Sequence, residues 1–152
     1  MSEAATDLKL IALDGEDLAV ISAHVQDAFV RRGEIAYLSG QKRFALGALR
    51  YDWAGSVAGR KERVGAVLRF DRVLKVSQTG LAGLKPDAML NLLAVSFDEN
   101  DPPAGIVTLT FSGGAAIRLH VECLESELRD IGPRRPVKAC PGHALANEGE
   151  TG

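Results

Sequence analysis

The stretch "IVTLTFSGGAAIRLHVEC" at residues 106–123 decides the fold class of this chain. On both sides of "SGG" its apolar residues alternate with polar ones, which is typical of two β-strands that each bury one face. The two glycines supply the backbone freedom that a tight turn requires. We therefore predict an antiparallel hairpin whose buried faces are formed by Val107, Leu109, Phe111, Ile117, Leu119 and Val121.

The same period of two extends toward the N-terminus. "EIAYLSGQKRFALGALRYDW" at 34–53 predicts a second hairpin, and "RVGAVLRFDRVLKVSQ" at 63–78 predicts one long strand with a bulge after Phe70. "LKLIAL" at 8–13 and "MLNLLAVSFD" at 89–98 predict two more strands. "AGSVAGRKE" at 54–62 is small, polar and basic, and predicts a mobile loop.

Two segments instead have helical spacing. "LAVISAHVQDAFVRR" at 18–32 follows the capping acids Asp14 and Asp17 and predicts an amphipathic helix that ends at Gly33. "LESELRDIG" at 124–132 predicts a short C-terminal helix. The expected fold is thus α+β: a strongly twisted antiparallel meander of about six to seven strands between these helices, similar in element order to a partly closed roll of the pleckstrin-homology kind.

A chain of 152 residues has the size of one domain. We expect a flexible N-terminus at 1–7, a single α+β domain at 8–133 and a disordered tail at 134–152, where apolar residues are few. No apolar run approaches the ~20 residues of a membrane helix, and the first residues lack the pattern of a secretory signal. The sequence therefore predicts a cytoplasmic protein without a membrane partner.

"HVEC" at 120–123 and "CPGH" at 140–143 place His120, Cys123, Cys140 and His143 at spacings that structural zinc sites use. On the predicted strand, however, residues three apart point to opposite faces, so His120 and Cys123 diverge. We expect no metal here and treat Cys123 as a buried apolar side chain. The chain has no catalytic signature and no motif for a cofactor, and His24 falls at the edge of the helix's apolar stripe, where packing is the expected role.

Basic residues are concentrated in the middle of the chain. Residues 31–75 hold eleven Lys and Arg against four acids, a balance of +7, whereas the overall net charge is −2. This segment either binds an anionic partner or pairs with acids of the same fold. The candidate anion- or partner-binding residues are Lys42, Arg43, Arg50, Arg60, Lys61, Arg69 and Arg72. An aromatic content of 5% and a pI of 5.9 speak against a dedicated nucleic-acid domain.

Three stretches carry a resemblance to a known family: "RYDW" at 50–53, "VLRFDRVLKV" at 67–76 and "IRLHVECLESELRDIGP" at 117–133. Across residues 8–133 the chain resembles a small proteobacterial family catalogued only as a domain of unknown function. This resemblance implies no activity, cofactor or catalytic residue.

We therefore expect a non-catalytic cytoplasmic binding or accessory module that acts through contact with another protein. The alternative is an anion or nucleic-acid binder that uses the basic 42–75 segment. A small enzyme with an unrecognised site is the third hypothesis.

Overall fold

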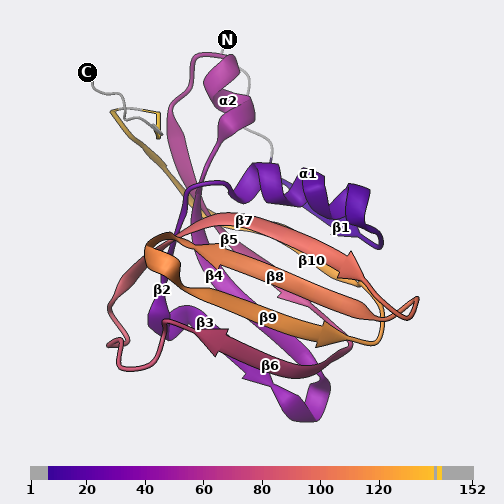
Figure 1. The fold of residues 1–152 in the computed structure, drawn as a ribbon. Helices are drawn as coiled ribbons and strands as arrows, with labels where there is room; N and C mark the ends of the chain where they lie inside the picture. Colours follow the sequence, from indigo (N-terminus) through magenta and orange to yellow (C-terminus); the bar gives the residue numbers. More distant parts are fainter. Residues whose placement is uncertain (1–6, 139, 142–152) are drawn as a thin grey trace.

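The computed structural model describes residues 7–138, 140 and 141, and antiparallel strands make up most of it (Figure 1). The strands are β1 Lys9–Ala12, β2 Ala28–Arg31, β3 Ile35–Leu38, β4 Arg43–Tyr51, β5 Glu62–Phe70, β6 Val73–Thr79, β7 Met89–Glu99, β8 Gly105–Phe111, β9 Ala116–Val121 and β10 Ser126–Pro136. The helices are α1 Gly15–Val25 and α2 Trp53–Val57, and the 3-10 turns are η1 Arg32–Glu34, η2 Ser39–Gln41 and η3 Ser112–Gly114.

All ten strands belong to one sheet, in the order β1-β10-β5-β4-β2-β7-β8-β9-β6, with β3 paired to β4. The sheet folds over on itself (Figure 1). One half contains β7, β8, β9 and β6, the other contains β1, β10, β5, β4 and β3, and β2 pairs with both β4 and β7. A single apolar core lies between the halves, because the buried side chains of both halves form one cluster.

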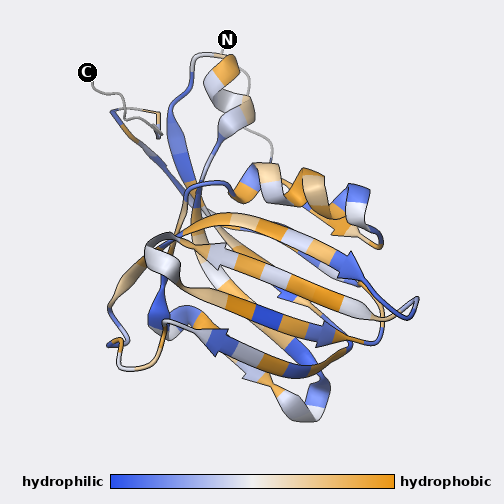
Figure 2. Cartoon of the chain, viewed as in Figure 1, coloured by the Kyte–Doolittle hydropathy of each residue, from blue (hydrophilic) through white to orange (hydrophobic). Residues whose placement is uncertain are grey.

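The hairpin at 106–123 is confirmed. β8 and β9 pair antiparallel, with Val107 opposite Leu119 and Leu109 opposite Ile117, and these four side chains are fully buried. Figure 2 shows the alternation of hydrophobic and hydrophilic residues along these strands. The register follows from the period of two, because a slip by one residue would turn the apolar side chains toward water.

Helix α1 lies along β7 and β1 at one edge of the folded sheet (Figure 1). The Asp14 side chain accepts a hydrogen bond from the Asp17 N–H at 2.8 Å and caps the helix, which buries Leu18, Ile21 and Val25. The helix ends at Val25, before the expected end at 32. Asp27 has a left-handed φ of 62°, and the residues after it form β2 instead.

The expected α+β fold, a meander of six to seven strands in a roll of the pleckstrin-homology kind with a short C-terminal helix, is wrong. The described residues form ten antiparallel strands in one sheet with two α-helices. Residues 126–136, placed in that helix and in the tail, form β10 between β1 and β5. The alternation of this strand is hard to see in the sequence, because Asp130 occupies a core-facing position next to Leu128. An acid can be buried there because Arg50, eighty residues away, pairs with it.

The expected long strand at 63–78 is also wrong, because it is two strands. β5 and β6 belong to opposite halves of the sheet, and Arg72, with φ of 63°, turns the chain between them. Within the expected loop at 54–62 the structure has α2, whose cap is the Asp52 carboxylate bonded to the Gly55 N–H at 2.9 Å. Residues 1–6 of the N-terminus, for which flexibility is expected, and residues 139 and 142–152 of the expected tail lie outside the described residues.

Candidate functional site

The seven candidate cations do not all lie on one surface, although Arg43 and Arg69 share Asp71 as a partner. Arg50 is buried in the core, whereas Arg69 points outward from β5 and Arg72 lies in the β5–β6 turn. Six of the seven have carboxylate partners in the same chain: Lys42–Glu122, Arg43–Asp71, Arg50–Asp130, Arg60–Glu62, Arg69–Asp71 and Glu127, and Arg72–Glu125. Lys61, the seventh, is exposed beside β5. Six of the seven candidate cations are therefore already paired with acids of the fold.

The buried pair of Arg50 and Asp130 connects β4 to β10. The guanidinium donates to both carboxylate oxygens, from Nε at 2.8 Å and from Nη2 at 2.7 Å, and both side chains are at most 1% exposed. The Leu8 N–H also donates to Asp130, at 2.9 Å. Such bidentate geometry, with the other lone pairs bonded, is what a buried ion pair needs in order to be tolerated.

Arg134 extends this pair toward the surface. It donates to the Asp52 carboxylate at 2.9 Å and lies 3.7 Å from Asp130. Burial alone would raise the pKa of Asp52, but the Gly55 N–H and the Arg134 guanidinium outweigh burial and hold that pKa below its ordinary value. Arg50 and Asp52, two residues apart in the chain, do not pair with each other, because each pairs with a residue of β10. The charged side chains of this network bond to one another, which is typical of a structural role.

In the part of the chain that the structure describes, the His and Cys residues with zinc-site spacing do not form a metal site. No group of three or more His, Cys, Asp or Glu side chains within residues 7–138, 140 and 141 is arranged to hold a metal ion. His143 lies outside these residues. Cys123 is half-buried and Cys140 is exposed, so the expected full burial of Cys123 is wrong.

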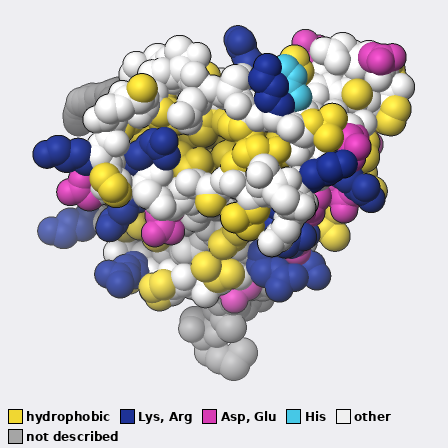
Figure 3. Space-filling view, turned by 90° about the horizontal axis from the view of Figure 1, so that it is seen from below, with side chains coloured by type: hydrophobic (Ala, Val, Ile, Leu, Met, Phe, Trp, Pro, Cys, Tyr) yellow, Lys and Arg dark blue, Asp and Glu magenta, His cyan; other side chains and the backbone are white. Residues whose placement is uncertain are grey.

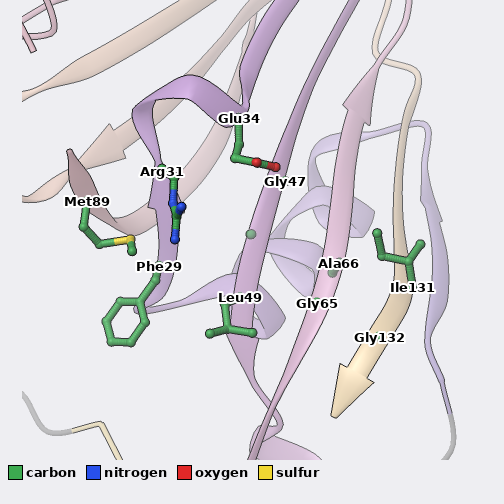
Figure 4. Close-up of a pocket in the computed structure, with 11 residues that line it drawn as sticks. Phe29, Arg31, Glu34, Gly47, Leu49, Gly65, Ala66, Met89, Ile131 and Gly132 are labelled. Atoms are coloured by element: carbon green, nitrogen blue, oxygen red, sulfur yellow. The ribbon is translucent and has the colours of Figure 1, made fainter. Parts of the chain in front are cut away.

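A groove on the outer face of β2, β4, β5 and β10 is the best candidate for a binding site. It has a volume of about 390 Å³ and is lined by Phe29, Arg31, Glu34, Gly47, Ala48, Leu49, Gly65, Ala66, Met89, Ile131 and Gly132. We call this set the outer groove. The groove follows from the strand register. Phe29 on β2 pairs with Leu49 on β4, and Leu49 pairs with Gly65 on β5. Ile131 follows in the bulge of β10 (Figure 4).

Two glycines form the floor of the outer groove. Gly47 and Gly65 occupy outward-facing positions of β4 and β5, where any other residue would project a side chain into the space. A Cβ on Gly65 would collide with the Gly132 carbonyl oxygen, so this glycine also lets the β10 bulge approach β5. A Cβ on Gly47 would meet only the end of the Glu34 side chain, at 2.7 Å.

The walls are apolar and partly fixed in place. Met89 and Ile131 are 54% and 64% exposed, although both are large apolar side chains. The Phe29 ring is held by the Arg63 guanidinium, whose carbon lies 3.9 Å from the ring centroid. Arg31 and Glu34 add one charge of each sign on the β2 side, across from Ile131 (Figure 4). The groove can therefore take an apolar side chain and interact with charges beside it.

Sequence reasoning did not identify the outer groove. A usable signal was present in "ALGAL" at 45–49 and "RVGAV" at 63–67, where a glycine interrupts an otherwise apolar strand. Such a glycine indicates a close backbone approach or a hollow. The strand order that brings these glycines together with Ile131 and Met89 is not visible in the pattern.

Neither α1 nor α2 is long and apolar enough to cross a membrane, and these are the α-helices of the described residues. No curated protein and no solved structure matches the chain. A family model matches residues 8–143, which confirms the family resemblance in the sequence. The chain belongs to the family described as "Protein of unknown function (DUF2948)".

Proposed function

We propose that this chain is a non-catalytic cytoplasmic binding module that holds another protein through the outer groove. The observation that carries the proposal is the hollow that Gly47 and Gly65 help to line, open to solvent and flanked by the exposed apolar side chains of Met89 and Ile131. Exposed apolar side chains that gather around a concavity are typical of interaction sites.

The proposed occupant is an apolar side chain on an extended segment of the partner. The space of about 390 Å³ matches one large side chain with its flanking backbone, and it is wide open on one side. Arg31 has no carboxylate partner among the described residues and favours an acidic residue next to the apolar one. Glu34 favours a basic residue further along the segment.

The ion pairs of the basic middle segment favour a protein over a polyanion. Six of the seven candidate cations already pair with acids of the same chain, which weakens their attraction for phosphates. Binding of a nucleic acid is therefore the competing outcome of the test rather than a second proposal.

A displayed library of ten-residue peptides tests the proposal with a defined probe. Selection on the native chain should enrich peptides with one large apolar residue beside an acid. These peptides should bind Gly47→Val and Ile131→Glu at least about tenfold more weakly, because the first fills the floor and the second puts a charge on the wall. The matched control is Gly40→Val, which adds the same side chain where nothing lies within 4 Å.

Selected peptides that bind Gly47→Val as tightly as the native chain would overturn the proposal. So would a selection that enriches only acidic peptides whose binding disappears when salt is raised, since that result identifies an anion site instead.

A further inference from the structure

β3 and β6 leave an open seam between the two halves of the sheet. Within the described residues β3 pairs only with β4, and β6 only with β9. The seam is closed at one end. There the Tyr37 hydroxyl of β3 donates to the Val73 carbonyl at 2.9 Å, and the Val73 N–H donates to the carbonyl of Lys42, just before β4, at 2.9 Å. No ladder connects β3 to β6 in the rest of the described seam. The seam is therefore closed at Val73 and open toward Gln78.

A pocket of about 280 Å³ lies in the open part of the seam and reaches the core. Its apolar lining comes from four strands: Ile35, Tyr37, Phe44, Val76 and Ile117. Phe44 and Ile117 are only 1% and 0% exposed, so they form the floor. Arg32 and Gln78 are the polar residues of the lining. Figure 3 views the molecule from the side where β3 and β6 lie in Figure 1 and shows hydrophobic side chains in a hollow among Lys and Arg.

We propose that this seam binds a small amphipathic carboxylate, with its apolar body between β3 and β6 and its carboxylate on Arg32. Mouths of barrel-like sheets are common ligand sites, and an apolar pocket with a few polar groups is their usual form. Arg32 is the one charged residue of the lining, and its guanidinium can bond both carboxylate oxygens. No acid lines the pocket to compete with the ligand or repel it.

The size of the pocket limits the ligand. A pocket of about 280 Å³ has room for a short apolar body but not for a long acyl chain. The site shares no lining residue with the outer groove, so the proposal does not depend on the function proposed for that groove.

Octanoate is a suitable probe, followed by amide chemical shifts in a ¹H–¹⁵N NMR titration of the full chain. We expect saturable shifts at Ile35, Val76 and Ile117. Octanamide, which has nearly the same shape without the charge, should bind about tenfold more weakly. Butanoate should also bind more weakly, because it buries less apolar surface.

Two adjacent arginines give a matched pair of variants. Arg32→Gln should weaken octanoate binding about tenfold or more, whereas Arg31→Gln removes the same charge from the outer groove and should leave octanoate binding unchanged. Gly47→Val should also leave it unchanged. Absence of saturable shifts, shifts confined to residues away from the seam, or equal losses in Arg31→Gln and Arg32→Gln would overturn the proposal.

Discussion

At the scale of single residues, glycine has two distinct uses in the outer groove. At position 65 only glycine fits, because the Cβ of any other residue would meet the carbonyl of Gly132. That carbonyl cannot move without shifting the β10 bulge. At position 47 it only leaves space, because the neighbouring atom is the free end of Glu34. Glycine is thus required by the backbone at position 65, whereas at position 47 a Cβ would meet only a side chain that can move.

This difference predicts unequal effects of the same substitution on the free energy of unfolding. Gly65→Ala should lower the free energy of unfolding by about 2 kcal/mol or more, because backbone has to shift. Gly47→Ala should change it by less than about 1 kcal/mol, since Glu34 rotates away and alanine suits a strand better than glycine. Urea unfolding measures both. Equal destabilisation by the two substitutions would contradict the different roles.

His24 predicts a dependence of stability on pH. Burial and then the Arg50 charge lower its pKa below 6.5, and together they outweigh the opposite effects of Asp130 and Asp52. The unfolded chain therefore binds a proton more readily than the folded chain. The stability tied to neutral His24 is complete above pH 6.5 and is lost as the pH falls from there through the folded pKa.

Urea unfolding at pH 7.5 and pH 5.5 measures this effect. The native chain should lose stability on acidification, and His24→Gln should lose less, because the proton-binding difference is gone. If both chains lose the same amount, another group governs this pH range.

At the scale of elements, the Arg50–Asp130 pair explains why β10 is a strand. The spacing of Leu124, Leu128 and Ile131 fits a helix equally well, and the local sequence does not decide between the two. The pairing of β10 with β5 on one side and β1 on the other decides it, together with the ion pair to β4. These partners are remote in the chain, so a local pattern could not predict them.

A double-mutant cycle on this pair should show strong coupling. Asp130→Leu should cost about 3–5 kcal/mol, because it leaves the Arg50 charge buried without a partner. Arg50→Met should cost less, since Asp130 keeps the Leu8 N–H and a neighbouring Arg134. The double variant should be more stable than the sum of the single effects predicts, by at least about 1 kcal/mol. Additive effects would mean that the pair does not act as a unit.

At the scale of the whole molecule, hairpins could be predicted and their assembly could not. The β8–β9 and β3–β4 hairpins follow from alternation and turn residues, which are local. The placement of β6 and β10 depends on crossovers between the halves of the sheet, and alternation contains no information about strand order. The outer groove depends on that strand order. It could therefore not be predicted from the sequence, although its two glycines can be recognised there.

The charge pattern gave a misleading picture of the surface for the same reason. The +7 balance of residues 31–75 is real, but the fold places acids from outside this segment, such as Glu122, Glu125 and Glu127, next to its cations. A segment's net charge predicts an electrostatic surface only when its neighbours in space are known.

The outer groove is the surface through which we propose that another protein binds. The most direct test compares proteins captured from the organism's own lysate by the tagged native chain, by Gly47→Val and by Gly40→Val, with nuclease and at two salt concentrations. We predict a partner that the native chain and Gly40→Val retain under all conditions and that Gly47→Val loses, because only the last fills the groove. Equal capture by Gly47→Val and the native chain, or capture that nuclease or salt abolishes, would contradict the claim.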